Sequence, residues 1–301
     1  MNAGLGELAA IGTALTWGLS TQVHGAVGRM VGSTGVTLLR LPYQIFFLGL
    51  MCLIFQAEIQ MTWSGLTLLF ISGFLGIFVS DFCLYRAINV IGPAMAVLIL
   101  SSSTVFSTFF GWVFLGETMP MQALAGIGLT MAGILWVVTE QSGSTLIPGQ
   151  EIPRGRELIR GLLLALGAAA ALAGSFIFLK IGMRTGINPL WASFVRVFFG
   201  GLALWAMGLA RGWVTAVRQG LIQYPKIYWM LFLSCAFGST GMWLSSLAVN
   251  LAPVGIAATL IGLQPVVVTL MGAVWYKRSL SLRIITGIAV AFGGTALICL
   301  T

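Results

Sequence analysis

The chain has 301 residues, of which 58% are hydrophobic and only 7% are charged, and its formal net charge is +8. A soluble domain carries roughly 25% charged residues, so this chain cannot cover a water-facing surface and is predicted to be an integral membrane protein. Its basic residues are dispersed, which argues against a nucleic-acid partner and makes the lipid bilayer its expected surroundings.

Apolar runs of about 20 residues, long enough to cross a bilayer as helices, follow one another along the chain. We predict ten spans, at residues 5–28, 36–56, 64–88, 93–115, 119–139, 159–183, 189–210, 227–250, 254–276 and 282–300. The N-terminal run lacks a basic segment before it, so we interpret it as the first span and not as a removed signal peptide. Long uniform runs favour helices over the alternating strands of a barrel, which predicts an all-α membrane protein.

A polar stretch from Thr139 to Glu157 divides the chain near its middle. We therefore predict a first repeat at 1–140, a linker at 141–157 and a second repeat at 158–301. A shift of 161 positions pairs residues late in each half, namely Ala87 with Ala248, Asn89 with Asn250, Ala96 with Ala257, Gly111 with Gly272, Gly126 with Gly287 and Gly133 with Gly294. A shift of 155 or 156 pairs residues early in each half, namely Gly6 with Gly161, Gly12 with Gly167, Ser20 with Ser175 and Arg40 with Arg196. Because five is odd, the second half must enter the membrane from the opposite side, which predicts two inverted five-helix repeats around a central cavity.

Several motifs are informative through their order and spacing along the chain. Arg40 and Arg196 lie early in the second helix of each half, and YRAINVIGPAMAVLI (Tyr85 to Ile99) spans the joint between the third and fourth helices. WVFLGETM (Trp112 to Met119) precedes the fifth helix, and LQPVV (Leu263 to Val267) lies in the ninth.

With these motifs, each half resembles an EamA domain of the drug/metabolite transporter superfamily. The resemblance implies a ten-helix bacterial permease of the plasma membrane, the inner membrane, that exports amino acids or related solutes by alternating access. Two features depart from the family pattern. The second half has Lys277-Arg278 where the first has Gly116-Glu117, and QAEIQ (Gln56 to Gln60) replaces the usual basic loop.

Asp81 and Arg86 are charged residues within an apolar run, and at five positions apart they do not share a helix face. A charge inside a bilayer is costly, so Asp81 requires a partner or a water-filled cavity. We consider an ion pair with Arg40, Lys180 or Arg196, a role in the transport cavity that includes proton coupling, and a shorter helix that leaves Asp81 in a loop.

Gln264 and Pro265 lie centrally in the ninth span, where the proline is expected to kink the helix. Interrupted helices near the membrane midplane are typical of transporter substrate sites, although a packing kink explains the pair equally well. The equivalent positions in the first half are Ser103 and Thr104, whose hydroxyls either bind a substrate or satisfy carbonyls of their own helix.

Further polar side chains follow helical spacing and are candidates for substrate binding. With Tyr85, Ser103 and Gln264, this candidate set comprises Trp17, Ser20, Thr21, His24, Trp243, Ser246 and Asn250. His24 is the only histidine, and it is either an interfacial polar residue or a proton relay.

Catalytic motifs are missing from the sequence: it has no G-x-S-x-G, no H-E-x-x-H and no Walker A loop. The four cysteines (Cys52, Cys83, Cys235 and Cys299) lie in apolar runs without a C-x-x-C, so we expect no metal, no cofactor and no enzymatic activity. The expected partners are a small-molecule substrate and, as a hypothesis, protons as the coupling ion.

Two alternatives to amino acid export stay open. One is a carrier of anionic metabolites, because Arg40, Arg86, Lys180 and Arg196 outnumber the single clear acid, Asp81. The other is a non-transporting membrane subunit or a component of a lipid-carrier flippase.

Orientation is indicated by the basic residues. They concentrate in the odd-numbered loops, which the positive-inside rule places in the cytoplasm, so we predict both termini outside. The family resemblance implies the opposite, and the sequence indicates no oligomeric state.

Overall fold

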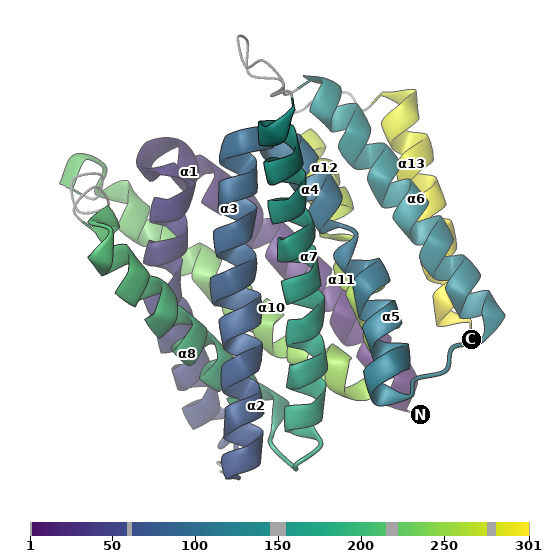
Figure 1. Cartoon of the computed structure of the whole chain (residues 1–301), viewed down its shortest axis with the longest axis horizontal. Helices are drawn as coiled ribbons and strands as arrows, with labels where there is room; N and C mark the ends of the chain where they lie inside the picture. The colour runs from purple at the N-terminus through teal and green to yellow at the C-terminus, as the bar shows by residue number, and fades with distance from the viewer. Residues whose placement is uncertain (1, 59–61, 145–154, 215–221, 276–280, 301) are drawn as a thin grey trace.

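The computed structural model describes residues 2–58, 62–144, 155–214, 222–275 and 281–300, and all regular structure within these ranges is helical (Figure 1). In chain order the helices are α1 (Asn2–Ile54), α2 (Trp63–Gly73), η1 (Phe74–Val79), α3 (Ser80–Ile91), α4 (Pro93–Leu100), α5 (Ser103–Leu115), α6 (Met121–Ser144), α7 (Arg156–Met183), α8 (Pro189–Ala210), α10 (Lys226–Leu251), α11 (Val254–Ile261), α12 (Gln264–Trp275) and α13 (Leu282–Cys299). The predicted fold class, an all-α membrane protein of two inverted repeats, is confirmed.

The first two predicted spans are joined in the long helix α1. The chain reverses at Gly32, whose φ of 75° lies in the left-handed region that glycine adopts without strain. Nine segments of the described chain are long and apolar enough to cross a bilayer, and the first of them in chain order is Gly35–Ile54. The first predicted span, which lies in α1 before Gly32, is not among these nine. Its Gln22 donates from Nε2 to the carbonyl of Val268 on α12 at 2.7 Å, and its His24 lies 3.4 Å from the hydroxyl of Ser20 on the same helix.

The third span runs through α2, η1 and α3, with a π-helical turn at Phe74–Val79. Asp81 therefore lies inside a helix that continues to Ile91, which corrects the alternative of a shorter helix. The glycines around the turn permit close packing: a Cβ at Gly73 would lie 2.3 Å from the carbonyl oxygen of Arg196 on α8.

The fourth and ninth spans are both interrupted, and at equivalent places. α4 and α5 are separated at Ser101 and Ser102, and α11 and α12 at Gly262 and Leu263. These positions coincide under the shift of 161 that relates the two halves. Pro265 thus lies in the first turn of a new helix, where a missing N–H costs nothing, and it does not kink a continuous one.

The two halves interlock through equivalent helices. α1 packs along α10, and α7 packs against α2, η1 and α3. A Cβ at Gly6 would lie 3.0 Å from Cβ of Ala252, and a Cβ at the equivalent Gly161 would lie 2.3 Å from Cγ2 of Ile91. Because Ile91 and Ala252 are also equivalent, the same close approach occurs once in each direction, as inverted repeats require.

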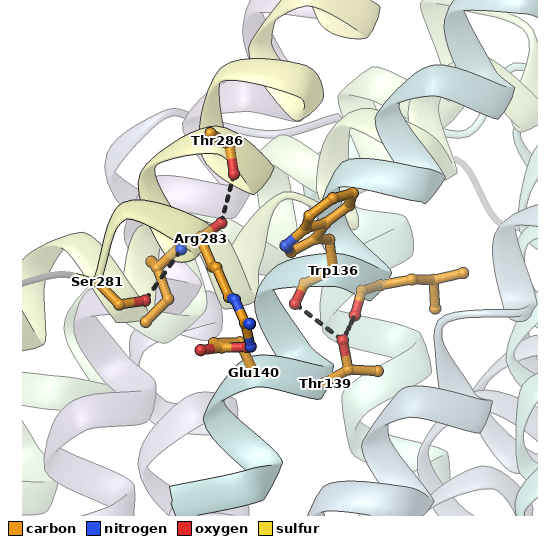
Figure 2. Close-up of polar contacts among 8 residues, drawn as sticks. Trp136, Thr139, Glu140, Ser281, Arg283 and Thr286 are labelled. Carbon is orange, nitrogen blue, oxygen red and sulfur yellow. Dashed lines mark hydrogen bonds and ion pairs between the residues drawn. The ribbon is translucent and has the colours of Figure 1, made fainter.

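The fifth and tenth spans, α6 and α13, form a pair at one edge of the bundle (Figure 1). A Cβ at Gly133 would lie 2.4 Å from the amide nitrogen of Ala291, and a Cβ at Gly294 would lie 2.4 Å from that of Thr130. Such small-residue contacts let helix backbones approach closely in membranes. Figure 2 shows the end of this pair, where Arg283 reaches Glu140 at 3.8 Å.

The surface of the bundle is apolar, as expected for a lipid-facing exterior. Large exposed side chains include Leu8, Leu53, Phe114 and Leu163, whereas the buried core is built mainly from Ala, Val, Ile and Leu. Both marked termini lie at the same end of the bundle, which agrees with an even number of spans (Figure 1).

Candidate functional site

The two helix breaks lie side by side in the interior. A Cβ at Gly262 would lie 3.5 Å from Oγ1 of Thr104, the buried second residue of α5. Gln264 begins α12, and its Nε2 donates to Oγ1 of Thr21 on α1 at 2.7 Å. Ser103 is half-buried at the first position of α5. The two breaks and α1 therefore place amide and hydroxyl groups where the backbone hydrogen bonds depart from the regular α-helical pattern.

The polar stripe predicted on the first span divides between two neighbouring helices. Thr21 faces α12, whereas Trp17 Nε1 donates to the carbonyl of Gly238 on α10 at 3.3 Å. The hydroxyl of Ser20 donates to the carbonyl of Ser234 at 2.9 Å, and it lies 3.4 Å from Nε2 of His24.

Asp81 forms an ion pair with Arg40, with Oδ2 and Nη2 2.6 Å apart and both side chains mostly buried. One turn away on each helix, the hydroxyl of Thr37 hydrogen-bonds that of Tyr85. The pair and the hydrogen bond together join α1 to α3 at two successive levels.

The second half repeats this arrangement with one change. Ser193 and Ser246 occupy the positions equivalent to Thr37 and Tyr85, and their hydroxyls are 2.7 Å apart. Arg196 is equivalent to Arg40, but the position equivalent to Asp81 is Met242. Arg196 is 4% exposed and donates from Nη2 to Oγ of Ser175 at 2.8 Å.

A small cavity of about 50 Å³ opens beside Tyr85, which gives room for water and not for a metabolite. Its lining includes Thr37, Phe82, Arg86, Asn89 and Trp213. The guanidinium carbons of Arg86 and Arg211 lie 5.3 Å and 5.9 Å from the centroid of the Phe82 ring. Arg86 therefore turns away from Asp81, as their separation along the helix predicts.

Lys180 pairs with Glu117 and not with Asp81. Its Nζ lies 2.6 Å from Oε1 of Glu117 and 2.6 Å from the carbonyl oxygen of Ala252. The other carboxylate oxygen of Glu117 accepts the N–H of Val254, the first residue of α11, at 2.7 Å. The Gly-Glu motif of the first half thus anchors a helix N-terminus of the second half. Its counterpart, Lys277-Arg278, lies outside the described residues.

Trp243 and Asn250, the remaining candidates for substrate binding, lie apart from the helix breaks and the ion pairs. Trp243 is half-buried with its ring centroid 5.5 Å from that of Phe55, at the end of α1. Asn250 is half-buried in the last turn of α10.

Sequence reasoning missed Thr37, Ser193 and Ser175 as members of polar clusters. The repeat shifts could have revealed Thr37 and Ser193, because they map Thr37 onto Ser193 and Tyr85 onto Ser246, which was a predicted substrate-binding residue.

Two interlocked five-helix halves with interrupted helices at equivalent depths define a membrane transporter architecture. The model of the EamA-like transporter family matches residues 4–139 and 159–300, so the chain belongs to this family. A search of the curated proteins gave no match. A solved structure described only as "Crystal structure of protein" has a TM-score of 0.70 at 17% identity, covering 99% of this chain and 96% of the other. That likeness concerns the fold.

Proposed function

We propose that this protein moves small polar metabolites, with amino acids and related solutes as the first class, across a bacterial plasma membrane by alternating access. The observation that carries the proposal is the pair of helix breaks at Ser101–Ser102 and Gly262–Leu263. At these breaks the backbone hydrogen bonds change pattern, with the N–H of Ser102 bonded to Ile99 and that of Leu263 bonded to Leu260, three residues back. Interrupted helices near the midplane of inverted repeats are typical of transporter substrate sites.

The proposed solute path runs past Thr104, Thr21 and Gln264, between the two halves. The amide of Gln264 offers both a donor and an acceptor, which suits a solute with mixed polar groups. On this proposal Tyr85, Ser246 and Trp17 line the same path in other conformations, and each now hydrogen-bonds a neighbouring helix.

Proteoliposomes containing the purified protein test the proposal. Vesicles preloaded with each of a panel of amino acids, organic acids and sugars should accumulate the matching labelled solute by saturable counterflow for at least one member. Gln264→Leu should weaken this counterflow about tenfold, because a buried polar contact to the solute is lost. Counterflow that is absent across the panel would favour a non-transporting membrane subunit or a flippase component.

A further inference from the structure

The broken symmetry between the halves concerns a buried charge. Arg40 in the first half has Asp81 at 2.6 Å. Arg196 in the second half is more deeply buried, and among the described residues no carboxylate lies within ion-pair distance of it. Met242 stands where the acid would be, and its carbonyl accepts a hydrogen bond from Ser193, one turn from Arg196.

Arg196 lies too deep in the bundle for its charge to reach the lipid headgroups at the membrane surface. It is the eighth residue of α8 (Pro189–Ala210), which places it about 10 Å from the nearer end of the helix at 1.5 Å per residue. An arginine keeps its proton in proteins, so burial does not neutralise it. An uncompensated ion in this environment costs several kcal/mol, which an anion from outside the chain would offset.

The surroundings of Arg196 leave hydrogen-bonding capacity unused. Its Nη2 donates to Ser175, but within the described part of the chain its Nε is buried without a partner. The neighbouring π-helical turn, Phe74–Val79, contains Gly76, where a Cβ would lie 2.3 Å from Oγ of Ser175 and 3.4 Å from Nη2 of Arg196. Glycine thus lets the turn pack directly against Ser175 and the guanidinium, with no side chain of its own between them. π-helical turns are frequent at functional sites.

We propose that Arg196 binds a carboxylate group of the transported solute, so that the solute completes in the second half the ion pair that Asp81 completes in the first. The inference rests on the proposed transport function and specifies the substrate as an organic acid or amino acid. The fork of the guanidinium matches a carboxylate in a bidentate geometry, and the hydroxyl of Ser175 lies within reach of the same group.

Met242→Asp provides a direct test, because it supplies the missing acid from within the chain. Binding is measured by thermal shift of the purified protein, with amino acids and 2-oxo acids compared with their primary amides and with sodium chloride at equal ionic strength. We expect at least one acid to stabilise the wild type where its amide and chloride do not. Met242→Asp should then weaken binding of that acid about tenfold or more, whereas the matched control Met242→Asn should retain it within about threefold.

Arg196→Lys keeps the charge but loses the fork, and it carries the test if Met242→Asp fails to fold. It should weaken acid binding about tenfold. The inference is overturned if acids and amides bind alike, if chloride alone reproduces the stabilisation, or if both variants bind acids as the wild type does. Counterflow of neutral solutes that is indifferent to both variants would overturn this inference while leaving the transport function intact.

Discussion

Lys180 in the second half forms a buried ion pair with Glu117 in the first half, with Nζ and Oε1 2.6 Å apart. Their side chains are 11% and 9% exposed. The same carboxylate accepts the N–H of Val254, and the same ammonium donates to Ala252. These contacts tie the loop before α6 to the joint between α10 and α11, so one cluster connects the two repeats.

Glu117→Gln should destabilise the protein, because it leaves the ammonium of Lys180 buried without its counter-charge. Breaking such a pair from one side costs about 3–5 kcal/mol. Thermal unfolding in detergent should show a clear fall in melting temperature, and Glu117→Gln combined with Lys180→Met should recover part of it. Glu140→Gln is the matched control, since its partner Arg283 is 75% exposed and such pairs contribute about 0–1 kcal/mol (Figure 2). Equal effects of the two glutamine variants would contradict a structural role for the buried pair.

We propose that Asp81 carries the coupling proton, so Asp81→Asn should abolish uphill transport driven by a pH gradient. Protonation of Asp81 breaks its ion pair with Arg40, and Tyr85, His24 and Cys235 are the other titratable groups around this pair. An asparagine cannot change its charge, so we expect solute counterflow to persist while accumulation against a gradient is lost. If the flux, its pH dependence and the melting temperature of this variant equal those of the wild type, Asp81 has no part in the mechanism.

Gly133→Ala should separate α6 from α13, because its Cβ would lie 2.4 Å from the backbone of Ala291. Overpacking of this kind costs about 1–3 kcal/mol. Gly128 lies on the same helix, and a Cβ there would meet no neighbouring atom within 4 Å, so Gly128→Ala is the control and should leave the melting temperature unchanged or slightly higher. A similar loss of stability in both variants would show that helix propensity, and not close packing, determines the effect.

The spans and their repetition were predictable from the sequence because lipid imposes length and apolarity on every crossing helix. Each boundary follows a Gly, Pro or polar residue, as at Gly92 and Asn188. The break at Ser101–Ser102 was not predicted, because serine is tolerated inside membrane helices. The repeat shift could have revealed it, since it maps this site onto the residues just before Gln264.

The ion pairs were less accessible to sequence reasoning. Arg40, Lys180 and Arg196 were all possible partners of Asp81, and the choice depends on which helix faces meet across the bundle. Glu117 and Lys180 are 63 positions apart and belong to different repeats, so no local spacing relates them. Only tertiary packing shows that Arg40 satisfies Asp81 and that Glu117 satisfies Lys180.

A pair of C-terminal reporter fusions tests the orientation. The excess of basic residues in the odd-numbered loops predicts both termini outside, so a phosphatase fusion should be active and a green fluorescent protein fusion dark. Bright fluorescence with an inactive phosphatase would place the termini in the cytoplasm.

The central claim is that solute passes between the halves beside the two helix breaks, and a cross-link at this point tests it most directly. Thr104→Cys with Gly262→Cys, in a variant without the four native cysteines, brings two thiols to positions that a disulfide can join. The control pair is Val137→Cys with Gly287→Cys, which links α6 to α13 away from the breaks. The account predicts that oxidation of the first pair stops counterflow in proteoliposomes, that reduction restores it, and that the control pair stays active throughout. Full counterflow with the first cross-link quantitatively formed would contradict it.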